Sequence, residues 1–272
     1  MRTAETTKDE SRSAPRKGRP KIVVVMPAYN AAETLEATFR GIDGDLVDEI
    51  ILVDDHSKDS TVNIARKLGV KVFVHSKNRG YGGNQKTCYC EALRLQADIV
   101  VMLHPDGQYQ PSLMADLIQP ILCGQADAVL GSRMMPPGSA RQGGMPLYKY
   151  VANRFLTAIE NLILRQKLSE YHTGYRAFSR DFLQTIPFRH NSEGYVFDTE
   201  MLVQAVHFHC RIHEIPISTR YFEGASSASF GQSTVYGLQT LWTLLKYLLH
   251  RSTLKPCRLF QAPLEKVPET LA

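Results

Sequence analysis

Short apolar runs recur through the first half of the chain, each bounded by polar or turn-forming residues. They contain almost no polar positions, which is typical of parallel strands buried on both faces. These runs cover residues 21–26, 49–53, 70–74, 99–103 and 128–130. Pro27 follows the first run and has no N–H group to donate, so we expect that strand to stop there.

Amphipathic segments lie between these runs and predict helices. They cover residues 31–42, 60–69 and 84–95, and a fourth segment begins at Pro111. Asn30 can cap the first of these helices, with Glu33 at the third helical position as in a capping box. Strands that alternate with helices imply an α/β fold with a doubly wound, mainly parallel sheet and right-handed crossovers.

The second half of the chain changes character. A Gly/Pro-rich stretch, residues 131–144, predicts a loop. Beyond it we expect mostly helices and one further strand. The helices cover residues 147–167, 195–209 and 235–250, and the strand covers 211–219. We therefore predict a C-terminal helical region beside the sheet.

These patterns divide the chain into four parts. Residues 1–20 are polar and basic with almost no apolar content, which predicts a disordered tail. Residues 21–133 form the strand-rich half and residues 134–250 the helix-rich half. Residues 251–272 form a second tail.

Composition places the chain among globular proteins, since 43% of its residues are hydrophobic and 22% are charged. The net charge of +5 mildly favours anionic partners such as nucleotides, phosphates or acidic lipid surfaces. The cysteines have neither the spacing of a zinc site nor that of a disulfide framework, so we expect reduced thiols in the cytoplasm. They are Cys88, Cys90, Cys123, Cys210 and Cys257.

The apolar run at 99–103 ends in a polar motif, His104-Pro-Asp-Gly-Gln108. Open α/β sheets bind ligands at the carboxyl ends of their strands. In an extended chain His104, Asp106 and Gln108 would point to one side. An imidazole, a carboxylate and an amide there can hold a divalent cation beside a phosphate. The alternative is a strand end followed by a turn, since Pro, Asp and Gly are turn residues.

Seven short motifs follow one another along residues 20–250. They are Met-Pro-Ala-Tyr-Asn (26–30), Val-Asp-Asp-His-Ser (53–57), Asn-Arg-Gly-Tyr-Gly (78–82), His-Pro-Asp-Gly-Gln (104–108), Gly-Ser-Arg (131–133), Thr-Gly-Tyr-Arg (173–176) and Gly-Tyr-Val-Phe-Asp-Thr-Glu (194–200). In this order they resemble family 2 glycosyltransferases with the GT-A fold, of the branch that contains dolichol-phosphate mannosyltransferases and other polyprenyl-phosphate glycosyltransferases. A single motif is weak evidence, but the ordered set is specific.

The resemblance implies that a nucleoside-diphosphate sugar binds at the carboxyl ends of the first strands. There the Tyr29 ring can stack on a nucleobase, and Asp54 or Asp55 can accept from a base N–H or a ribose hydroxyl. A turn and a helix cap are the alternative for the two aspartates. The implied donor-binding residues are Pro27, Ala28, Tyr29, Asn30, Asp54, Asp55, Gly82, Asp106 and Arg133.

Asp106 is the implied catalytic residue. With His104 and Gln108 it would hold Mg²⁺ or Mn²⁺ against the diphosphate of the donor, where the cation neutralises the leaving group. Relatives usually carry Asp-x-Asp at this motif, and His104 replaces the first aspartate. An imidazole still ligates but brings no negative charge, which predicts weaker metal binding or a preference for Mn²⁺.

The implied acceptor is a polyprenyl phosphate, dolichyl or undecaprenyl, and the implied reaction inverts the sugar carbon. Phosphate contacts are expected from Arg176, Arg220 and Ser227, and a salt bridge is the alternative for each arginine. Relatives often have Gly-x-Ser-Lys after Arg220. This chain reads Gly224-Ala-Ser-Ser227 and lacks the lysine, which removes one expected phosphate contact.

Other functions stay open. A hydroxyl acceptor would need a carboxylate base, for which Glu170, Asp198 and Glu200 are candidates. A sugar-nucleotide-binding protein without turnover would share the same pocket. A nucleotidyltransferase is expected to have a Gly-rich, basic phosphate-binding loop near its first strand. Residues 27–30 do not resemble such a loop, which disfavours this function.

The last predicted helix carries an apolar stripe, but its apolar stretch at 238–249 is too short to cross a membrane. Basic residues follow the stripe. It consists of Leu238, Leu241, Trp242, Leu245, Leu248 and Leu249. Such a helix suits a membrane interface, and it equally suits a cover for the protein's own core or a dimer contact. We expect a cytoplasmic protein with peripheral contact to the inner face of the membrane and no nucleic-acid partner.

Overall fold

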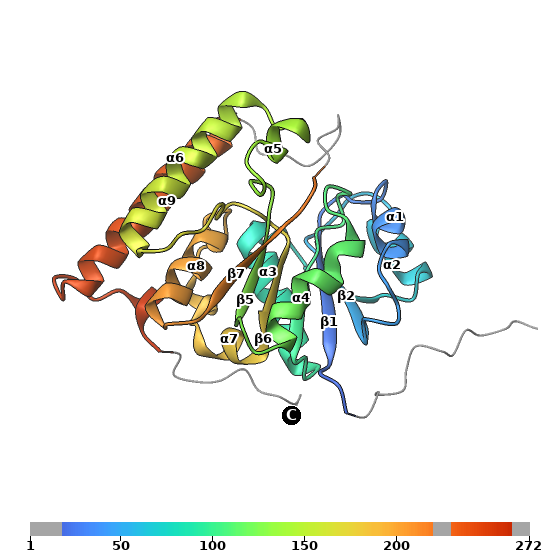
Figure 1. Cartoon of the computed structure of the whole chain (residues 1–272). Coiled ribbons are helices and arrows are strands. Elements are labelled where there is room, and N and C mark those ends of the chain that lie inside the picture. Colours follow the sequence, from blue (N-terminus) through green and yellow to red (C-terminus); the bar gives the residue numbers. More distant parts are fainter. Residues whose placement is uncertain (1–17, 220–229, 263–272) are drawn as a thin grey trace, which may run out of the picture.

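A computed structural model describes residues 18–219 and 230–262 of the chain. The strands in these ranges form one sheet in the order β3-β2-β1-β4-β6-β5-β7 (Figure 1). They are β1 (Ile22–Ala28), β2 (Glu49–Asp54), β3 (Lys71–Val74), β4 (Ile99–Met102), β5 (Ala128–Ser132), β6 (Arg176–Ser179) and β7 (Ile212–Pro216). Neighbouring strands are parallel except at β6, which is antiparallel to both β4 and β5.

Helices cover both faces of the sheet (Figure 1). In chain order they are α1 (Leu35–Arg40), α2 (Thr61–Lys67), α3 (Gly80–Arg94), α4 (Met114–Leu122), α5 (Ser139–Gln142), α6 (Leu147–Leu164), α7 (Arg180–Thr185), α8 (Phe197–His207) and α9 (Phe230–Arg251). Short 3-10 turns lie at Pro111–Leu113, Phe188–His190 and Arg258–Phe260.

Alternate residues of β1 enter two separate cores because successive side chains of a strand point to opposite faces. Val24 and Met26 pack with α1, α2 and α4. Val23 and Val25 pack with α3, α7 and α8 on the other face. Both faces of the strand are therefore buried, which explains why the strand-forming runs contain almost no polar residue.

A third apolar core lies outside these layers, where α6 and α9 pack together and α9 also packs on α8. Leu164, Leu202 and Leu244 from these three helices meet Leu130 of β5. Figure 1 shows α6 and α9 lying side by side along one edge of the molecule. Within the ranges that the structure describes, no helix is both long and apolar enough to cross a membrane.

The sequence predicts that β1 stops at Pro27, but the strand continues to Ala28. The backbone oxygen of Val25 accepts from Leu103 N, so the backbone polar groups of Val25 point toward β4. These groups alternate in direction along a strand, so the backbone nitrogen of Pro27, two residues later, also points toward β4. The pairing between β1 and β4 has already ended, at Val25 and Met102. The missing N–H of Pro27 therefore costs no hydrogen bond of the sheet, while the pairing with β2 continues.

The helix after β1 is shorter than predicted, and Asn30 does not cap it. α1 begins at Leu35 after the cap residue Thr34, so Glu33 lies before the helix and forms no capping box. Asn30 has a φ of 51°, and its Oδ1 accepts from Lys58 N at 2.9 Å. The side chain thus joins two loops, a role that local capping preferences could not reveal.

β6 and α7 are absent from the sequence prediction. β6 lies between β4 and β5, so a strand from the second half of the chain completes the middle of the sheet. Two helices also begin earlier than predicted, α3 at Gly80 and α9 at Phe230. The division of the chain at residue 133 stays a prediction, and one sheet takes strands from both sides of it.

Candidate active site

Three loops meet at one edge of the sheet because β1, β2 and β4 are parallel and end there. Tyr29 and Asn30 follow β1, Asp55 follows β2, and His104 lies just beyond β4. The first two loops are tied together, since Asn30 N donates to Ser57 Oγ at 2.8 Å. The structure thus brings the residues of three predicted motifs to a single edge.

Asp54 and Asp55 are both buried but have different surroundings. Asp55 lies 2.8 Å from His75 Nδ1 and accepts from Gly80 N at 2.9 Å, so it holds the start of α3. Asp54 Oδ2 accepts from Ser57 N at 2.9 Å. Asp54 Oδ1 has no hydrogen-bond partner among the described residues, although it is buried. Since buried polar atoms are normally paired, this oxygen is the better candidate for a ligand donor.

Gly82, which the family resemblance places among the donor-binding residues, lies in the first turn of α3. Its N–H donates to Glu193 O at 2.7 Å. A Cβ added at Gly82 would lie 2.4 Å from Ser192 O and 2.7 Å from Phe197 Cβ. In the structure, the close approach at Gly82 is therefore made by the chain's own backbone.

The central motif turns rather than extends, so the predicted alternation of its side chains is wrong. A turn covers Pro105 and Asp106, and Gly107 has a φ of 72°. Asp106 Oδ1 accepts from Gln108 N at 3.0 Å. Pro, Asp and Gly thus form the turn that their preferences favour, and the end of β4 is marked by a change of chain direction.

His104 packs inside the site edge. Its ring stacks on Tyr81, with centroids 5.5 Å apart, and its Nε2 lies 3.4 Å from the Tyr81 hydroxyl oxygen. On another side it touches Gly174, where an added Cβ would lie 2.8 Å from the ring. Tyr109, which follows the motif, accepts from Gly174 N at 2.9 Å through its hydroxyl. These contacts hold the imidazole close to Asp106, whose negative charge acts to raise the pKa of His104.

Burial disfavours the charged forms of both titratable side chains of the central motif. It raises the pKa of Asp106, although the neighbouring His104 opposes the shift. It lowers the pKa of His104, despite the opposing charges of Asp106 and Asp198. A neutral imidazole is the form that binds metals, and a cation beside the carboxylate would offset its burial cost.

The residues present fit a cation that is shared with a ligand better than one held by protein alone. No group of three or more His, Cys, Asp or Glu side chains is arranged as a metal site in residues 18–219 and 230–262. His104, Asp106 and Gln108 supply an imidazole, a carboxylate and an amide. Mg²⁺ is commonly bound by one or two carboxylates together with substrate phosphates and water, which suits this small set.

The sequence predicts a phosphate contact for Arg176, but the structure buries its guanidinium inside the protein. Nε donates to Thr173 O at 2.7 Å, and a terminal nitrogen donates to Tyr171 O at 3.0 Å. The other terminal nitrogen lies 3.2 Å from Asp198 Oδ1. Arg176 therefore joins the segment before β6 to α8 and has the alternative, structural role.

Arg133 pairs with the fully buried Glu170, again as a salt bridge. Nε of Arg133 donates to Glu170 Oε1 at 2.9 Å, and its backbone N donates to Oε2 at 2.8 Å. Asn153 Nδ2 also donates to Oε1, at 2.8 Å. Burial by itself raises the pKa of Glu170, but the charge and hydrogen bonds of Arg133 outweigh it and the pKa lies below its usual range. A carboxylate held in this way is a poor base.

The other two carboxylates considered as bases are also engaged. Asp198 accepts from Tyr81 Oη at 2.7 Å and from Gln85 Nε2 at 3.1 Å. Glu200 accepts from Ser192 N at 2.5 Å. All three candidate bases thus form hydrogen bonds within the protein. This disfavours a reaction in which one of them takes the proton of a hydroxyl acceptor.

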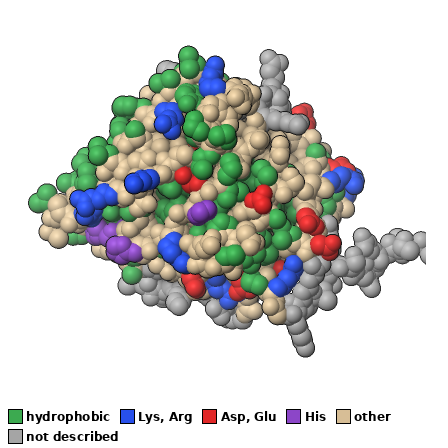
Figure 2. All heavy atoms as spheres, viewed as in Figure 1, with side chains coloured by type: hydrophobic (Ala, Val, Ile, Leu, Met, Phe, Trp, Pro, Cys, Tyr) green, Lys and Arg blue, Asp and Glu red, His purple; other side chains and the backbone are tan. Residues whose placement is uncertain are grey.

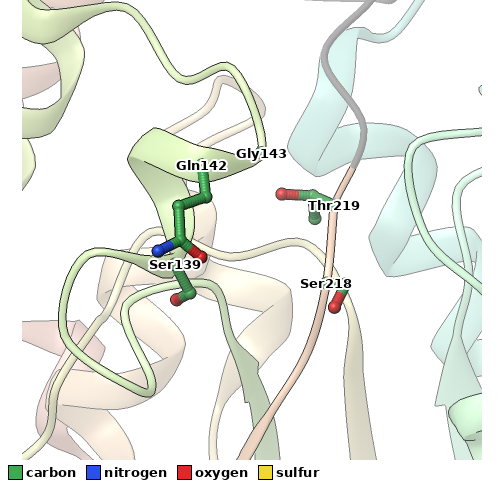
Figure 3. A pocket seen from close by; sticks show the side chains of 5 residues that line it. All are labelled: Ser139, Gln142, Gly143, Ser218 and Thr219. Carbon is green, nitrogen blue, oxygen red and sulfur yellow. The ribbon is translucent and has the colours of Figure 1, made fainter.

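A small cavity of about 250 Å³ lies between α5 and the end of β7. Figure 3 shows the side chains of α5 on one side of it and Ser218 and Thr219 on the other. It is lined by Ser139, Gln142, Gly143, Ser218 and Thr219. Thr219 also forms an isolated bridge with Tyr109, so the cavity adjoins the central motif. Arg220 and Ser227, predicted to contact the acceptor phosphate, lie outside the described residues.

Tyr81 and Tyr195 belong to this edge but were not predicted to contribute to it. Their rings lie 4.9 Å apart, and Tyr195 is 43% exposed. The only signal in the sequence is that each tyrosine follows a glycine in one of the seven motifs, as Gly80-Tyr81 and Gly194-Tyr195. Each motif shows no partner by itself, because the two tyrosines come from distant segments.

Comparison with known proteins agrees with this arrangement. The sequence model of glycosyl transferase family 2 matches residues 23–186, which is more than half of the chain. The chain belongs to this family. The match covers the site edge from β1 to α7, and the predicted membership is confirmed.

Relatives of this family 2 glycosyltransferase include enzymes that act on lipid phosphates. The UDP-N-acetylglucosamine–dolichyl-phosphate N-acetylglucosaminyltransferase of Methanococcus voltae is 31% identical over 241 residues, covering 82% of this chain and 94% of that protein. The undecaprenyl-phosphate mannosyltransferase of Micrococcus luteus is 27% identical, covering 83% of this chain and 98% of that protein. The chain is therefore a glycosyltransferase, as predicted.

The fold is also that of solved glycosyltransferases. Glucosyl-3-phosphoglycerate synthase of Mycobacterium tuberculosis, crystallised with Mn²⁺, UDP and phosphoglyceric acid, superposes with a TM-score of 0.65 at 21% identity. The superposition covers 84% of this chain and 78% of that one. The predicted GT-A fold is confirmed, and at this identity the likeness concerns the fold alone.

Proposed function

We propose that this glycosyltransferase transfers a sugar from a nucleoside-diphosphate sugar to a polyprenyl phosphate, with inversion at the sugar carbon and with Mg²⁺ or Mn²⁺ bound at the central motif. The observation that carries the proposal is the meeting of three motif-bearing loops at one sheet edge. Relatives that act on dolichyl and undecaprenyl phosphates support the choice of acceptor.

The donor's nucleoside would bind beside β1 and β2. Tyr29 is 53% exposed and offers its ring to a base. The unpaired Oδ1 of Asp54 would accept from a base N–H or a ribose hydroxyl. Such a contact would satisfy an oxygen that the protein itself leaves without a partner, so it would favour binding by more than an ordinary surface contact.

The donor's diphosphate would lie at the central motif. His104, Asp106 and Gln108 would hold a cation there, and this cation would neutralise the charge that develops on the leaving diphosphate. A phosphate oxygen of the acceptor would form the new bond to the sugar carbon as the bond from that carbon to the donor's diphosphate breaks. The acceptor oxygen is already negative at pH 7 and needs no base, which agrees with the engagement of Glu170, Asp198 and Glu200 in the fold.

The acceptor's phosphate would enter from the side of the α5–β7 cavity, where hydroxyl and amide groups already line the wall. Arg220 and Ser227 lie in the segment of the chain that comes after β7, and they are proposed as contacts of the acceptor's phosphate. An acceptor of this kind lies in a membrane, so we infer that the enzyme works at the cytoplasmic face of one.

Asp106→Ala tests the proposal. Asp106 is the only carboxylate of the central motif, so its loss should lower sugar transfer at least about 100-fold and remove the metal dependence of donor binding. Transfer is measured from labelled nucleoside-diphosphate sugars to a short-chain polyprenyl phosphate, and binding by calorimetry with and without Mn²⁺.

Asp116→Ala is the matched control, because Asp116 is an exposed carboxylate of α4 outside the motif, so its loss should leave both quantities unchanged. Wild-type transfer by Asp106→Ala would remove the metal from the mechanism. Donor binding by the wild type without transfer to any acceptor would favour the sugar-nucleotide-binding protein instead.

A further inference from the structure

Large hydrophobic side chains are exposed in one region of the described chain far more than elsewhere. Of the 15 that are exposed, 11 lie on α6, on α9 or just after α9. We call this set the α6–α9 face, and it consists of Leu147, Tyr148, Val151, Phe155, Leu162, Val235, Leu238, Trp242, Leu245, Leu248 and Leu254. Figure 2 shows hydrophobic side chains gathered along the edge of the molecule that α6 and α9 form. Patches of this extent mark interaction sites on soluble proteins.

Over much of its length α6 is inverted relative to an ordinary surface helix, although Leu164 at its end packs into the third core. Val151, Phe155 and Leu162 are 56%, 61% and 79% exposed, whereas Asn153 and Glu160 on the inner side are 8% and 0% exposed. A helix that covers a protein core normally turns its apolar stripe inward. The apolar stripe of α6 therefore needs a non-aqueous neighbour that the chain itself does not supply.

Inner partners fix the rotation of α6. Asn153 donates to Glu170 at 2.8 Å, and Glu160 Oε2 lies 3.1 Å from His172 Nε2. A rotation that hid Phe155 would break the buried hydrogen bond from Asn153 to Glu170 and would move Glu160 away from His172, which is costly. The outward stripe is consequently a built feature of the fold.

α9 shows the same arrangement in part. Leu238, Trp242 and Leu245 are 64%, 55% and 43% exposed, while Thr240 and Thr243 are buried. The structure thus decides one of the alternatives that the sequence left open, because most of the predicted stripe does not cover the protein's own core. A membrane and a second copy of the chain remain.

Charge distinguishes these two partners. Residues 147–167 and 230–262 contain eight basic residues and a single acidic one, the buried Glu160. The basic residues are Lys149, Arg154, Arg165, Lys167, Lys246, Arg251, Lys255 and Arg258, and of these Lys246 is already paired with Glu200 at 3.3 Å. Arg154 lies three residues after Val151 and so shares the outer side of α6. A second copy would bring the same positive charges against this face with no acidic partners, which opposes association.

We infer that the α6–α9 face is a membrane-binding surface, which lies in the headgroup region of a bilayer that contains anionic lipids. Apolar side chains would enter the acyl boundary while the basic side chains meet lipid phosphates, as for amphipathic helices in the plane of a membrane. The inference deepens the proposed function and rests on its lipid acceptor. α6 begins shortly after α5, which lines the acceptor-side cavity, so the face starts beside the expected entrance.

Trp242 provides a test that needs no substitution. It is the only tryptophan of the chain and lies on the face. The full-length protein is mixed with vesicles of phosphatidylglycerol and phosphatidylcholine, or of phosphatidylcholine alone, without donor or acceptor. We expect the Trp242 emission to shift to shorter wavelength with the anionic vesicles and to be quenched by brominated acyl chains, with a much weaker response to the neutral vesicles.

Phe155→Glu with Leu162→Glu tests the contribution of α6. Both side chains are exposed, so the double variant should keep the wild-type circular dichroism and melting temperature. Its affinity for the anionic vesicles, measured by co-sedimentation, should fall about tenfold or more. Leu122→Glu is the matched control, because Leu122 is 41% exposed on α4 outside the face and should leave vesicle binding unchanged.

Three outcomes would overturn the inference. They are an unchanged Trp242 emission with anionic vesicles, wild-type vesicle binding by the α6 variant, and a wild-type dimer in solution that this variant dissociates. Vesicle binding is measured without sugar transfer, so its failure would leave the proposed reaction untouched. Conversely, Asp106→Ala should bind vesicles like the wild type even where its transfer activity is lost.

Discussion

His104 lies where the family resemblance leads us to expect an aspartate, and it is closely packed. The ring is held by Tyr81 on one side and by Gly174 on the other. This packing explains how an imidazole fits there, but it leaves two roles, a metal ligand or a wall of the site. The choice of metal separates them, because an oxygen ligand suits Mg²⁺ better than nitrogen does.

We predict that His104→Asp keeps activity and raises the ratio of Mg²⁺-supported to Mn²⁺-supported turnover. His104→Ala should lose metal affinity, though less than Asp106→Ala does, since a neutral ligand contributes less than a charged one. Turnover is measured over a titration of each metal for the three variants and the wild type. If the metal ratio is unchanged in His104→Asp and the metal affinity of His104→Ala equals that of the wild type, His104 only lines the site and is not a metal ligand.

Glu170, considered above as a candidate base, stabilises the fold. It is fully buried and accepts from Arg133 and Asn153, whose side chains belong to separate segments. We predict that Glu170→Gln lowers the free energy of unfolding by about 3 kcal/mol at pH 7, because it leaves the Arg133 guanidinium without its charged partner. Urea denaturation followed by circular dichroism measures the difference, and the exposed pair Arg40–Glu36 offers a control in Glu36→Gln, which should change little.

The same difference should depend on pH. The pKa of Glu170 lies below its ordinary value of 4.5 in the folded protein, since the charge and hydrogen bonds of Arg133 outweigh the opposing effect of burial. The ionised carboxylate therefore stabilises the protein fully above pH 4.5, and this contribution is lost as the pH falls through the folded-state pKa. The gap between wild type and Glu170→Gln should narrow over that acidic range, and a gap that stays constant would show that packing alone causes it.

Residue identity predicted the position of the site better than the role of each side chain. Asp54 and Asp55 are adjacent and chemically alike, yet one has a free buried oxygen and the other holds α3. Arg176 matches a family motif but is buried among protein oxygens. Which partner a polar side chain takes depends on segments distant in sequence, and a local pattern carries no information about them.

At the scale of elements, the first turn of α3 depends on close packing against the segment that leads into α8. A Cβ at Gly82 would lie 2.4 Å from Ser192 O, well inside ordinary contact. We predict that Gly82→Ala lowers the free energy of unfolding by about 1–3 kcal/mol, since a backbone segment has to move. It should also weaken donor binding, because Asp55 and the start of α3 shift together. Chemical denaturation and calorimetry with the donor measure the two effects.

Gly237→Ala is the matched control for this substitution. Gly237 lies within α9, and a Cβ there would meet only Leu156, at an ordinary 3.7 Å. Alanine in a helix interior is favoured over glycine by about 0.5–1 kcal/mol, so the control should be neutral or slightly stabilising. A Gly82→Ala protein as stable as the wild type would contradict the prediction, because residues 192–197 could then move to admit the new Cβ at little cost in free energy.

Periodicity predicted the elements well, but it could not give the direction of their faces. The stripe at 3.6-residue spacing on α9 was visible in the sequence, and the same pattern suits an inward or an outward face. The answer depends on the inner partners of both helices, such as His172 for Glu160. β6 was missed for a related reason, since a strand of four residues has too few positions to show a period.

At the scale of the whole molecule, the order of the motifs predicted the fold because each motif lies where a strand or helix begins or ends. Parallel neighbours bring such ends together whatever their distance in sequence. The base, the sugar and the choice of metal are not contained in this topology, since they depend on a few contacts at the rim of the site. A measurement on the intact chain is the direct way to obtain them.

We predict that one nucleoside-diphosphate sugar, tested in a panel with Mn²⁺, raises the melting temperature of the intact protein. A ligand at 100 times its dissociation constant stabilises the folded state by about 2.7 kcal/mol. For a domain of this size that corresponds to a shift of roughly 5–10 °C. The shift should need both the cation and Asp106, because the diphosphate is proposed to bind through them, so Asp106→Ala should respond weakly to the same donor. An equal shift without Mn²⁺ would place the donor's affinity in the Tyr29 and Asp54 contacts alone, and the central motif would then have no part in holding the donor.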